Sequence, residues 1–301
     1  MSKISKYLRN PSLIPDRMLK LFSPILNDKL YLQLLWKASF KEHLNLKAPQ
    51  TFNEKLQWLK LYNRDPRYTM MVDKYLVKDY VSQIIGAEHV IPVIKRYDKP
   101  EQISLNELPE QFVLKCNHNS GAIWICKNKA EFDLDKVKAE IAVSLKEDYS
   151  LRGREWPYKN VQRCIIAEPY IEDSATGQLI DYKVFCFNGI PKAIQIDMDR
   201  YSGHRRNIIS TEGECLGYSV GDDAATDKSI PAPPAEQLNL LLEYAKKLSL
   251  GIPHVRVDFY IVDGCVIFGE MTFFHNSGFA KFVPESVNRL WGDWITLPIT
   301  D

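Results

Sequence analysis

Three charged side chains interrupt an otherwise apolar stretch near the C-terminus, residues 254–278, HVRVDFYIVDGCVIFGEMTFFHNSG. Arg256, Asp258 and Glu270 are the side-chain types that bind phosphate and divalent metal, because guanidinium forks fit phosphate oxygens and carboxylates are hard oxygen ligands. A charge inside an apolar strand pair is costly unless it is paired or coordinates a metal. We therefore expect a metal ion and a phosphate group here. The alternative is a solvent-facing sheet with a surface ion pair.

The same stretch predicts a β-hairpin that turns at Asp263-Gly264, a pair typical of short hairpin turns. Because side chains alternate between the faces of a strand, a two-residue turn would place Asp258 and Glu270 on opposite faces. A three-residue loop ending on the glycine would gather all three charges on one face. We therefore predict the three-residue loop, with Arg256 opposite Glu270 and Asp258 diagonal to it.

A second candidate phosphate site is Lys115, which lies in the predicted strand 111–117 directly before a small polar loop that ends in Asn119-Ser120-Gly121. A lysine supplies a point charge, and the N–H groups of such a loop can form an anion-binding nest. The loop is not a Walker A motif, which requires GxxxxGK followed by Ser or Thr. An exposed edge-strand lysine is the alternative.

The segment Glu168-Pro169-Tyr170-Ile171 ends a long apolar strand. Proline breaks the pairing of a strand and leaves backbone groups free, and free backbone groups beside apolar residues are what an adenine edge needs. Asp181 and Lys183 follow on the next predicted strand and share a face, so we count them as candidate nucleotide-binding residues. An inter-strand ion pair is the alternative for these two.

A third candidate site is Asp197-Met198-Asp199, which follows the apolar run AIQI. An Asp-x-Asp pair after a strand can hold a divalent metal on the diphosphate of a nucleotide sugar, although the pattern is short and common by chance. Basic residues follow it closely, and guanidinium forks bind carboxylate or phosphate. They are Arg200, His204, Arg205 and Arg206, and a solvated loop is the alternative reading.

The elements that would position these residues read as an α+β fold, with helices first and then antiparallel strands mixed with helices. A capping box, Thr51 with Glu54, opens a helix, and a helical stripe at 73–85 ends at Gly86. Further strands are predicted at 89–96, 111–117, 122–127, 163–172, 179–187 and 190–198. Further helices are predicted at 133–147 and 235–250, and a surface loop at 219–234.

The composition is that of an ordinary globular protein: of 301 residues, 45% are hydrophobic and 26% charged. We expect no transmembrane helix, because no run of 18 apolar residues occurs, and no signal peptide, because the N-terminus lacks an apolar core. The six cysteines show no close CxxC pair, which favours a reduced, cytoplasmic protein without a cysteine zinc site.

The small net charge of +1 hides an asymmetry. Residues 1–47 hold nine Lys or Arg against three acids, a net of +6. A basic segment that also carries aromatic and leucine side chains suits contact with an anionic membrane surface or an anionic polymer. The alternative is a helical flank whose charges are simply solvated. We expect no nucleic-acid partner.

Taken together, these motifs resemble an ATP-grasp ligase, and in particular the TupA-like branch associated with teichuronopeptide and other surface-polysaccharide synthesis. The resemblance runs from about residue 51 to 298 and rests on the order of several short motifs. They are TFNEKLQWLK, VDKYLVKDYV, FVLKCNHNSG, EPYIED, DYKVFCFNG and VRVDFY…FGEMTF. It implies an ATP-grasp fold in which two α+β subdomains clamp ATP, after a short helical N-terminal segment.

The resemblance also implies a role for each matching residue. Phosphate contacts fall to Lys74, Lys115 and the mobile loop Asn119, Ser120 and Gly121. Nucleoside contacts fall to Glu168, Tyr170, Ile171 and Asp181. Magnesium carboxylates are Asp258 and Glu270, and Arg256 steadies the transferring phosphoryl group and the tetrahedral intermediate. Asn276, Ser277 and Gly278 resemble the loop near the acceptor carboxylate, and Arg205 and Arg206 are counted with them as substrate-binding.

Two departures from the family pattern affect these expectations. The broad superfamily usually has Asn two residues after the second metal carboxylate, and Thr272 stands there in this chain. The usual N-terminal α/β domain is replaced by a short basic helical segment. We divide the chain into that segment at 1–72, an ATP-grasp lid subdomain at 73–170, and a C-terminal subdomain with the metal site at 171–301.

These expectations combine into an ATP- and magnesium-dependent carboxylate–amine ligase. Its substrates would be a uronic acid of a bacterial capsule, O-antigen or teichuronic-type precursor and an amino acid or other amine. It would work in the cytoplasm, with peripheral contact at the inner face of the membrane through the basic N-terminus. One alternative is a nucleotide-sugar glycosyltransferase using Asp197 and Asp199, and another is a nucleotide-binding regulator without catalysis.

Overall fold

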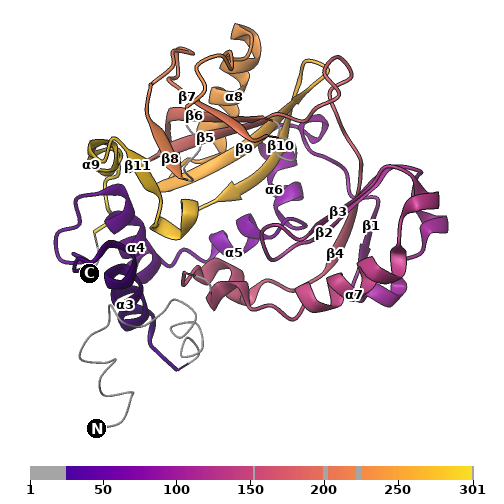
Figure 1. Ribbon diagram of the computed structural model, residues 1–301, viewed down its shortest axis with the longest axis horizontal. Helices are drawn as coiled ribbons and strands as arrows, with labels where there is room; N and C mark the ends of the chain where they lie inside the picture. The colour runs from indigo at the N-terminus through magenta and orange to yellow at the C-terminus, as the bar shows by residue number, and fades with distance from the viewer. Residues whose placement is uncertain (1–24, 152, 199–202, 222–225, 300–301) are drawn as a thin grey trace.

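Two antiparallel sheets, each in its own lobe, dominate the computed structural model, which describes residues 25–151, 153–198, 203–221 and 226–299 (Figure 1). The smaller lobe holds a four-stranded sheet in the order β1-β4-β2-β3. The larger lobe holds a five-stranded sheet in the order β10-β9-β5-β6-β7. An ATP-grasp arrangement requires two such α+β lobes, and the mixture of helices with antiparallel sheets agrees with the predicted fold class.

The smaller lobe consists of β1 (Lys95–Tyr97), β2 (Phe112–Cys116), β3 (Ile123–Cys126) and β4 (Ile165–Pro169), with α7 (Leu134–Ser144) packed below the sheet in Figure 1. Its own hydrophobic core is formed by residues between 97 and 167, including Phe112, Leu114 and Ile141. Short 3-10 turns lie before β1 at 87–89, between β1 and β2 at 100–102 and 105–107, and between β3 and α7 at 129–131. Two more follow α7 at 149–151 and 156–160.

The larger lobe consists of β5 (Asp181–Phe187), β6 (Ile190–Met198), β7 (Arg205–Ile209), β9 (His254–Val262) and β10 (Cys265–Thr272). Its core is packed by α8 (Ala235–Leu248) and by α4 (Phe52–Tyr62), α5 (Arg67–Val72) and α6 (Val77–Ile85). A two-stranded sheet of β8 (Ser219–Gly221) and β11 (Lys281–Val283), with α9 (Ser286–Asp293), closes one end.

Helix α3 (Asp28–Phe40) lies beside α4 and forms a small core of its own with Tyr31, Leu32 and Trp36. Five of the nine basic residues in 1–47 precede it, and they fall within residues 1–24, which lie outside the described part of the chain. Among the described helices, none is long and apolar enough to cross a membrane. The proposed domain boundaries at 72/73 and 170/171 stay predictions.

Most of the predicted elements form, usually with shorter ends. The capping box is confirmed, since the Thr51 side chain and the Glu54 carboxylate bond each other's backbone N–H groups at the start of α4. Helix α6 begins at Val77 and not at 73, because the Asp73 carboxylate accepts hydrogen bonds from the N–H groups of Tyr75 and Leu76 and holds a turn there. The strand predicted at 89–96 is reduced to β1, and the loop predicted at 219–234 begins with β8.

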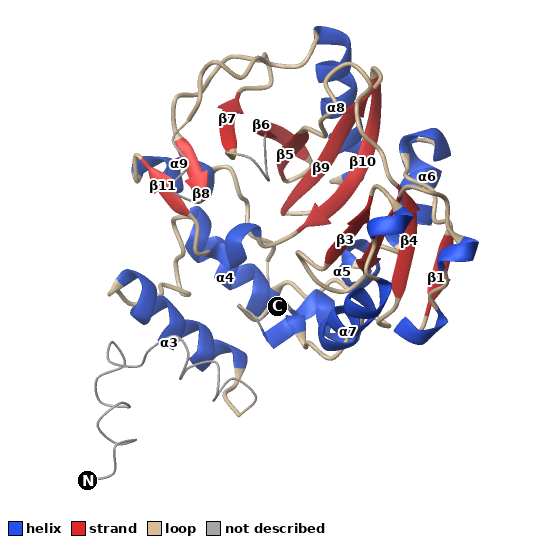
Figure 2. Ribbon diagram, turned by 45° about the vertical axis from the view of Figure 1, so that its right-hand side comes forward, coloured by secondary structure: helices blue, strands red, loops and turns tan. Residues whose placement is uncertain are grey.

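The hairpin of β9 and β10 differs from the prediction in an informative way (Figure 2). The predicted three-residue loop is wrong: Val262 pairs with Cys265 across a two-residue Asp263-Gly264 turn. A β-bulge at Gly269 then shifts the register, so that Asp258 pairs with Glu270. A bulge adds one residue to one strand and reverses which face the following side chains occupy. The charges therefore do share one face, as predicted, but for a different reason.

Candidate active site

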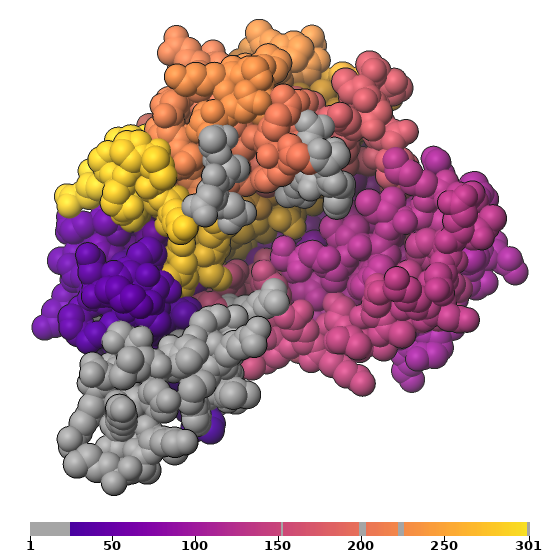
Figure 3. All heavy atoms as spheres, in the orientation of Figure 1, coloured from indigo at the N-terminus to yellow at the C-terminus, as the bar shows by residue number. Residues whose placement is uncertain are grey.

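Two adjoining cavities lie where the lobes face each other, and the space-filling view shows the two lobes meeting there (Figure 3). The first encloses about 280 Å³ and has mostly aliphatic and aromatic walls. The second encloses about 640 Å³ and is lined by many charged side chains. Lys115, Glu168, Asp181 and Tyr260 line both, so a single extended ligand can occupy the pair.

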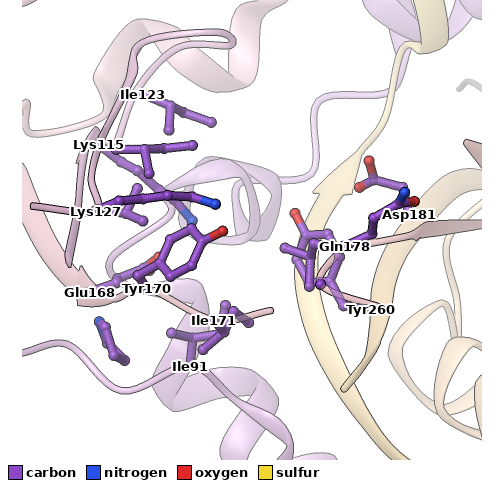
Figure 4. A pocket seen from close by; sticks show the side chains of 15 residues that line it. Ile91, Lys115, Ile123, Lys127, Glu168, Tyr170, Ile171, Gln178, Asp181 and Tyr260 are labelled. Carbon is purple, nitrogen blue, oxygen red and sulfur yellow. The ribbon is translucent and has the colours of Figure 1, made fainter. Parts of the chain in front are cut away.

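The smaller cavity fits a flat, mostly apolar group such as a nucleobase. One wall comes from the first sheet and its edge, with Ile91, Tyr170 and Ile171 in Figure 4, and the other wall from Gln178, Asp181 and Tyr260. Lys127 lies over the Tyr170 ring, with Nζ 4.8 Å from its centre. Ligand pockets of this kind combine apolar walls with a few polar groups that fix orientation. The structure thus brings together the residues predicted to frame adenine.

At the border of the two cavities, Glu168 accepts ion pairs from two lysines. Lys115 and Lys78 each place Nζ 2.6 Å from one of its carboxylate oxygens, and Lys78 also donates to the Ile91 carbonyl at 2.7 Å. Burial alone would raise the pKa of Glu168, but the two ammonium groups outweigh it and lower that pKa. Two cations held side by side suit a polyphosphate. Lys78 was not assigned in the sequence, although it is the second lysine of the Asp-Lys-x-x-x-Lys motif.

The loop after β2 is anchored by hydrogen bonds to neighbouring segments, and part of it lines the larger cavity. The buried Asn117 donates to Asp73 and to the Gln162 carbonyl, both at 2.9 Å, and accepts from the Cys164 N–H at 2.8 Å. Lys74 donates to the Asn119 carbonyl at 2.5 Å, whereas the Asn119 amide turns to Ser144 in α7. Ser120 and Gly121 line the larger cavity. Of the predicted loop residues, these two face the cavity and the Asn119 side chain does not.

A row of polar residues, three of them charged, crosses the larger sheet on the cavity side, because antiparallel pairing aligns them. Glu270 pairs with Asp258, Asp258 with Lys183, and Lys183 with Gln195, from β10 to β6. All four residues line the larger cavity.

Asp258 is the centre of this row, and Arg256 binds both of its oxygens, Nε to Oδ1 at 2.7 Å and Nη2 to Oδ2 at 2.6 Å. The same Arg256 Nη2 lies 3.4 Å from Glu270 and 3.2 Å from the Thr272 hydroxyl. Burial, together with the nearby Glu270 carboxylate, raises the pKa of Asp258 to about 6 against the opposing effect of Arg256.

The residues present fit a magnesium ion. No group of three or more His, Cys, Asp or Glu close enough to bind a metal occurs among the described residues. Magnesium is usually held by one or two carboxylates together with substrate phosphates and water. Asp258 and Glu270 pair directly and line the same cavity as the two lysines that suit a polyphosphate, which matches that pattern. The Thr272 hydroxyl adds a neutral oxygen at the position where the superfamily pattern has an amide.

Asp197 has a structural role that its Asp-x-Asp pattern did not reveal. Its two oxygens accept from Lys183, Gln195 at 2.8 Å, His204 at 2.9 Å and Arg206 at 2.7 Å. These contacts outweigh burial and hold the pKa of Asp197 well below its usual range. Lys183 is thereby committed to Asp197 and, at 3.8 Å, to Asp181. Asp199 and Arg200 lie outside the described residues.

The two candidate arginines of β7 point to different places, because neighbouring residues of a strand face opposite ways. Arg206 is buried and lines the larger cavity, whereas Arg205 pairs with Asp227 at 3.3 Å at the surface. The structure therefore brings Arg206, but not Arg205, to the candidate site.

The turn at 275–278 has an unusual backbone. Asn276 and Ser277 have φ values of 46° and 52° and Gly278 of 65°, a left-handed run that is sparsely populated for residues other than glycine. Asn276 lines the cavity, while Ser277 turns its hydroxyl to Glu155. The turn was predicted as a substrate loop, and its first residue alone of the three reaches the cavity wall.

A buried lysine holds this turn in place, and the sequence did not single it out. Lys60 of α4 is fully buried and donates to the carbonyls of Gly153 at 2.5 Å and Ser277 at 2.7 Å. Gln57 donates to the Gly278 carbonyl at 2.8 Å. Burial lowers the pKa of Lys60 to about 7, against the opposing charge of Glu155. The sequence signal that could have identified Lys60 is its position on the apolar stripe of a helix.

The site lies between two lobes, each built on an antiparallel sheet. It combines a nucleobase-sized pocket with paired lysines and two facing carboxylates, which is the pattern of the ATP-grasp class of protein. The model of the family described as TupA-like ATPgrasp matches residues 54–296, and the chain belongs to this family.

The chain is also similar, at low identity, to solved structures of ligases. A D-alanine–D-alanine ligase from Bacillus anthracis, complexed with ATP, is 16% identical, with a TM-score of 0.38 over 68% of this chain and 54% of that one. The ATP-grasp ligase PsnB, complexed with a minimal precursor, is 13% identical, with a TM-score of 0.38 over 73% and 58%. The chain thus spans between half and three-fifths of the length of these two proteins. Among curated proteins, none matches it.

Proposed function

We propose that the protein is an ATP-dependent carboxylate–amine ligase that forms an amide through an acylphosphate. The observation that carries the proposal is the order of groups along the two joined cavities. The base pocket lies at one end, Lys115 and Glu168 line both cavities, and the Asp258–Glu270 pair, Arg256 and Asn276 line only the larger of the two. This order matches ATP lying with its γ-phosphate near Arg256.

The reaction needs positioning and charge neutralisation more than a protein nucleophile. The substrate carboxylate attacks the γ-phosphorus and ADP leaves; the amine then attacks the acyl carbon and phosphate leaves. Lys74, Lys115 and Arg256, which line the larger cavity, would bind the phosphate oxygens, and Arg256 would also stabilise the oxyanion of the tetrahedral intermediate. When bound, magnesium would neutralise phosphate charge, with Asp258, Glu270 and Thr272 as the residues that would hold it.

Two considerations support a proposal for the substrate class: the resemblance to a family associated with surface-polysaccharide synthesis, and the charged residues of the larger cavity. We propose a uronic acid of a surface glycan or its precursor as the acid, and an amino acid or other amine as its partner. The basic N-terminal region suits an acidic or lipid-linked glycan held at the inner face of the membrane. These assignments rest on the charge of the cavity and the resemblance together.

A phosphate-release screen tests the proposal. Uronic acids are combined with amino acids in the presence of ATP and magnesium, and reactions without the acid or without the amine serve as blanks. The proposal expects ADP and phosphate only when acid and amine are both present, and their loss in Asp258→Asn and Glu270→Gln. ADP release that ignores the acid would contradict it. Nucleotide release from a nucleotide sugar, without ATP, would favour a glycosyltransferase instead.

A further inference from the structure

A histidine directly before β7 is oriented by a buried carboxylate. The His204 imidazole places Nε2 2.9 Å from Oδ1 of Asp197. The side chain of Asp197 is 2% exposed, whereas that of His204 is 32% exposed, and both residues line the larger cavity. A buried aspartate that holds the ring of a partly open histidine is the arrangement that orients a general base. The two residues therefore have the geometry of an Asp–His dyad.

The hydrogen bond to Asp197 determines which nitrogen of the neutral His204 ring is basic. Although burial opposes it, the charges of Lys183 and Arg206 hold the pKa of Asp197 well below its usual range, so its carboxylate is ionised. An ionised carboxylate can only accept, so Nε2 of His204 carries the proton and Nδ1 keeps its lone pair. Nδ1 has no hydrogen-bond partner among the described residues. Its lone pair can therefore accept a proton from a molecule in the cavity.

Asp197 anchors the histidine ring, because neighbouring strands already neutralise its charge. Lys183 of β5 donates to its Oδ2, and Arg206 of β7 donates through Nε, at 2.7 Å, to the same Oδ1 that His204 uses. Asp181 lies 3.8 Å from Lys183. Two cations and two carboxylates thus meet around the anchor, and their charges cancel. Asp197 can therefore fix the orientation of the ring, while the basic nitrogen is left to His204.

The dyad lies away from the base pocket, in the part of the site where the amide would form. Asp197 and His204 line only the larger of the two cavities. Arg206 extends from the dyad toward the turn that was predicted to bind substrate. A Cβ placed on Gly221 would lie 3.3 Å from Arg206 Nη1 and 2.9 Å from Asn276 Nδ2. A base at this place would meet the substrate groups and not the nucleoside.

We propose that His204 is the general base that deprotonates the incoming amine, with Asp197 as the residue that positions its ring. The inference rests on the proposed function and adds a catalytic residue to its second step. An amine enters as an ammonium ion, whose nitrogen has no lone pair for attack. Nδ1 of His204 takes one proton, and the freed lone pair of the amine attacks the acyl carbon of the acylphosphate. The bond from that carbon to the phosphate oxygen then breaks. Its electron pair and a second proton from the nitrogen leave as hydrogen phosphate, and the partly exposed imidazole returns the first proton to water.

A comparison of two nucleophiles separates proton removal from the rest of the reaction. Hydroxylamine is uncharged at neutral pH and attacks an acylphosphate without first losing a proton, whereas an amino acid enters as an ammonium ion. His204→Gln keeps a nitrogen donor for Asp197 in the place of Nε2 but has no basic nitrogen. With the acid and the amino acid that release phosphate in the screen, its rate of amide formation should fall roughly 100-fold or more, the usual contribution of a general base. Hydroxamate formation from the same acid and hydroxylamine should change little.

Isotope exchange in ATP reports the first step without any amine. ATP carries oxygen-18 in the bridge between its β- and γ-phosphates, and reversible transfer of the γ-phosphoryl group to the acid lets that oxygen change position on the β-phosphate. This acid-dependent exchange should persist in His204→Gln, because acylphosphate formation needs no base. His43→Gln is the matched control: His43 is exposed after α3 and lines neither cavity, so the variant should keep its rates with both nucleophiles.

Each outcome either supports or overturns the base role of His204. An unchanged rate with the amino acid in His204→Gln overturns it and leaves the ligase function standing. An equal loss with hydroxylamine, or loss of the isotope exchange, also overturns it, because His204 would then bind the acid or its acylphosphate and not remove a proton. If no pair of acid and amine gives an amide with the wild type, the ligase function fails and the base role fails with it.

Discussion

Arg256 binds both carboxylate oxygens of Asp258, at 2.7 and 2.6 Å, although these are the oxygens that a metal ion would use. The arginine therefore balances the charge of the Asp258 carboxylate. The same guanidinium reaches Glu270 and Thr272, so it occupies the centre of the proposed metal site. Metal binding and the position of Arg256 are thus expected to be coupled.

Arg256→Met should make stability depend more strongly on magnesium. The change leaves the Asp258 carboxylate buried without its partner, which costs about 3 kcal/mol in free energy of unfolding when a buried pair is broken. Magnesium with ADP should restore more stability to the variant than it adds to the wild type. Thermal unfolding with and without both ligands measures this. Arg205→Met, which removes an exposed pair with Asp227, is the control and should change little. Equal magnesium effects in wild type and variant would contradict the coupling.

Substitutions of Thr272 test whether its hydroxyl is the third protein ligand of the magnesium ion. Thr272→Val has the same shape without the hydroxyl, and the magnesium concentration for half-maximal activity should rise roughly five- to tenfold, as for the loss of one polar contact. Thr272→Asn supplies the amide oxygen that the superfamily usually has at this position and should hold the requirement near or below that of the wild type. Magnesium titrations of the identified reaction give both values. No change in the valine variant would remove Thr272 from the metal site.

Lys115→Met should reduce kcat/KM for ATP by an amount equal to about 2–4 kcal/mol, the usual cost of losing one preorganised donor to a reacting group. Lys78 would remain to pair with Glu168, so the fold should survive. Lys95→Met serves as the matched control in the same lobe, since Lys95 pairs with Glu107 at the surface. Steady-state kinetics measure kcat/KM for ATP in both variants. Similar losses in kcat/KM in the two variants would argue against a specific phosphate role for Lys115.

Lys60 should make stability depend on pH. Its pKa is lowered by burial to about 7 in the folded protein and returns to its ordinary value near 10.5 on unfolding. Between these values the unfolded chain binds the proton and the folded protein does not, so stability rises with pH across this window and the penalty is complete below pH 7. The free energy of unfolding of the wild type minus that of Lys60→Met should therefore increase from pH 7 to 10, by up to about 1.4 kcal/mol per pH unit. Urea unfolding at several pH values measures it, and a difference that does not change with pH would contradict it.

The hairpin shows what the sequence could and could not establish. Alternation along β9 correctly placed Arg256 and Asp258 on one face of the strand, and both line the larger cavity. The register of β10 was wrong because one residue, Gly269, is bulged, and a single extra residue reverses every later side chain. A glycine inside a strand was a usable sign of a bulge. With the bulge, a two-residue turn also places the three charges on one face.

Contacts between segments that are far apart in the chain could not be predicted from the sequence. Lys60 is one lysine among many until the fold brings the carbonyls of Gly153 and Ser277 to it. Likewise, Asp197 follows a pattern that suits a metal, and only the arrangement of strands shows that Lys183 and Arg206 bind its oxygens. Short motifs identified the residue types of the site, whereas which partner each one meets depends on tertiary packing.

Transfer of labelled oxygen tests the central claim most directly. An acid found in the screen is prepared with oxygen-18 in its carboxylate and incubated with ATP, magnesium and the amine, and the released phosphate is analysed by mass spectrometry. A ligase that works through an acylphosphate must transfer one carboxylate oxygen to phosphate for each amide formed. Phosphate that carries no label while amide accumulates would contradict the account.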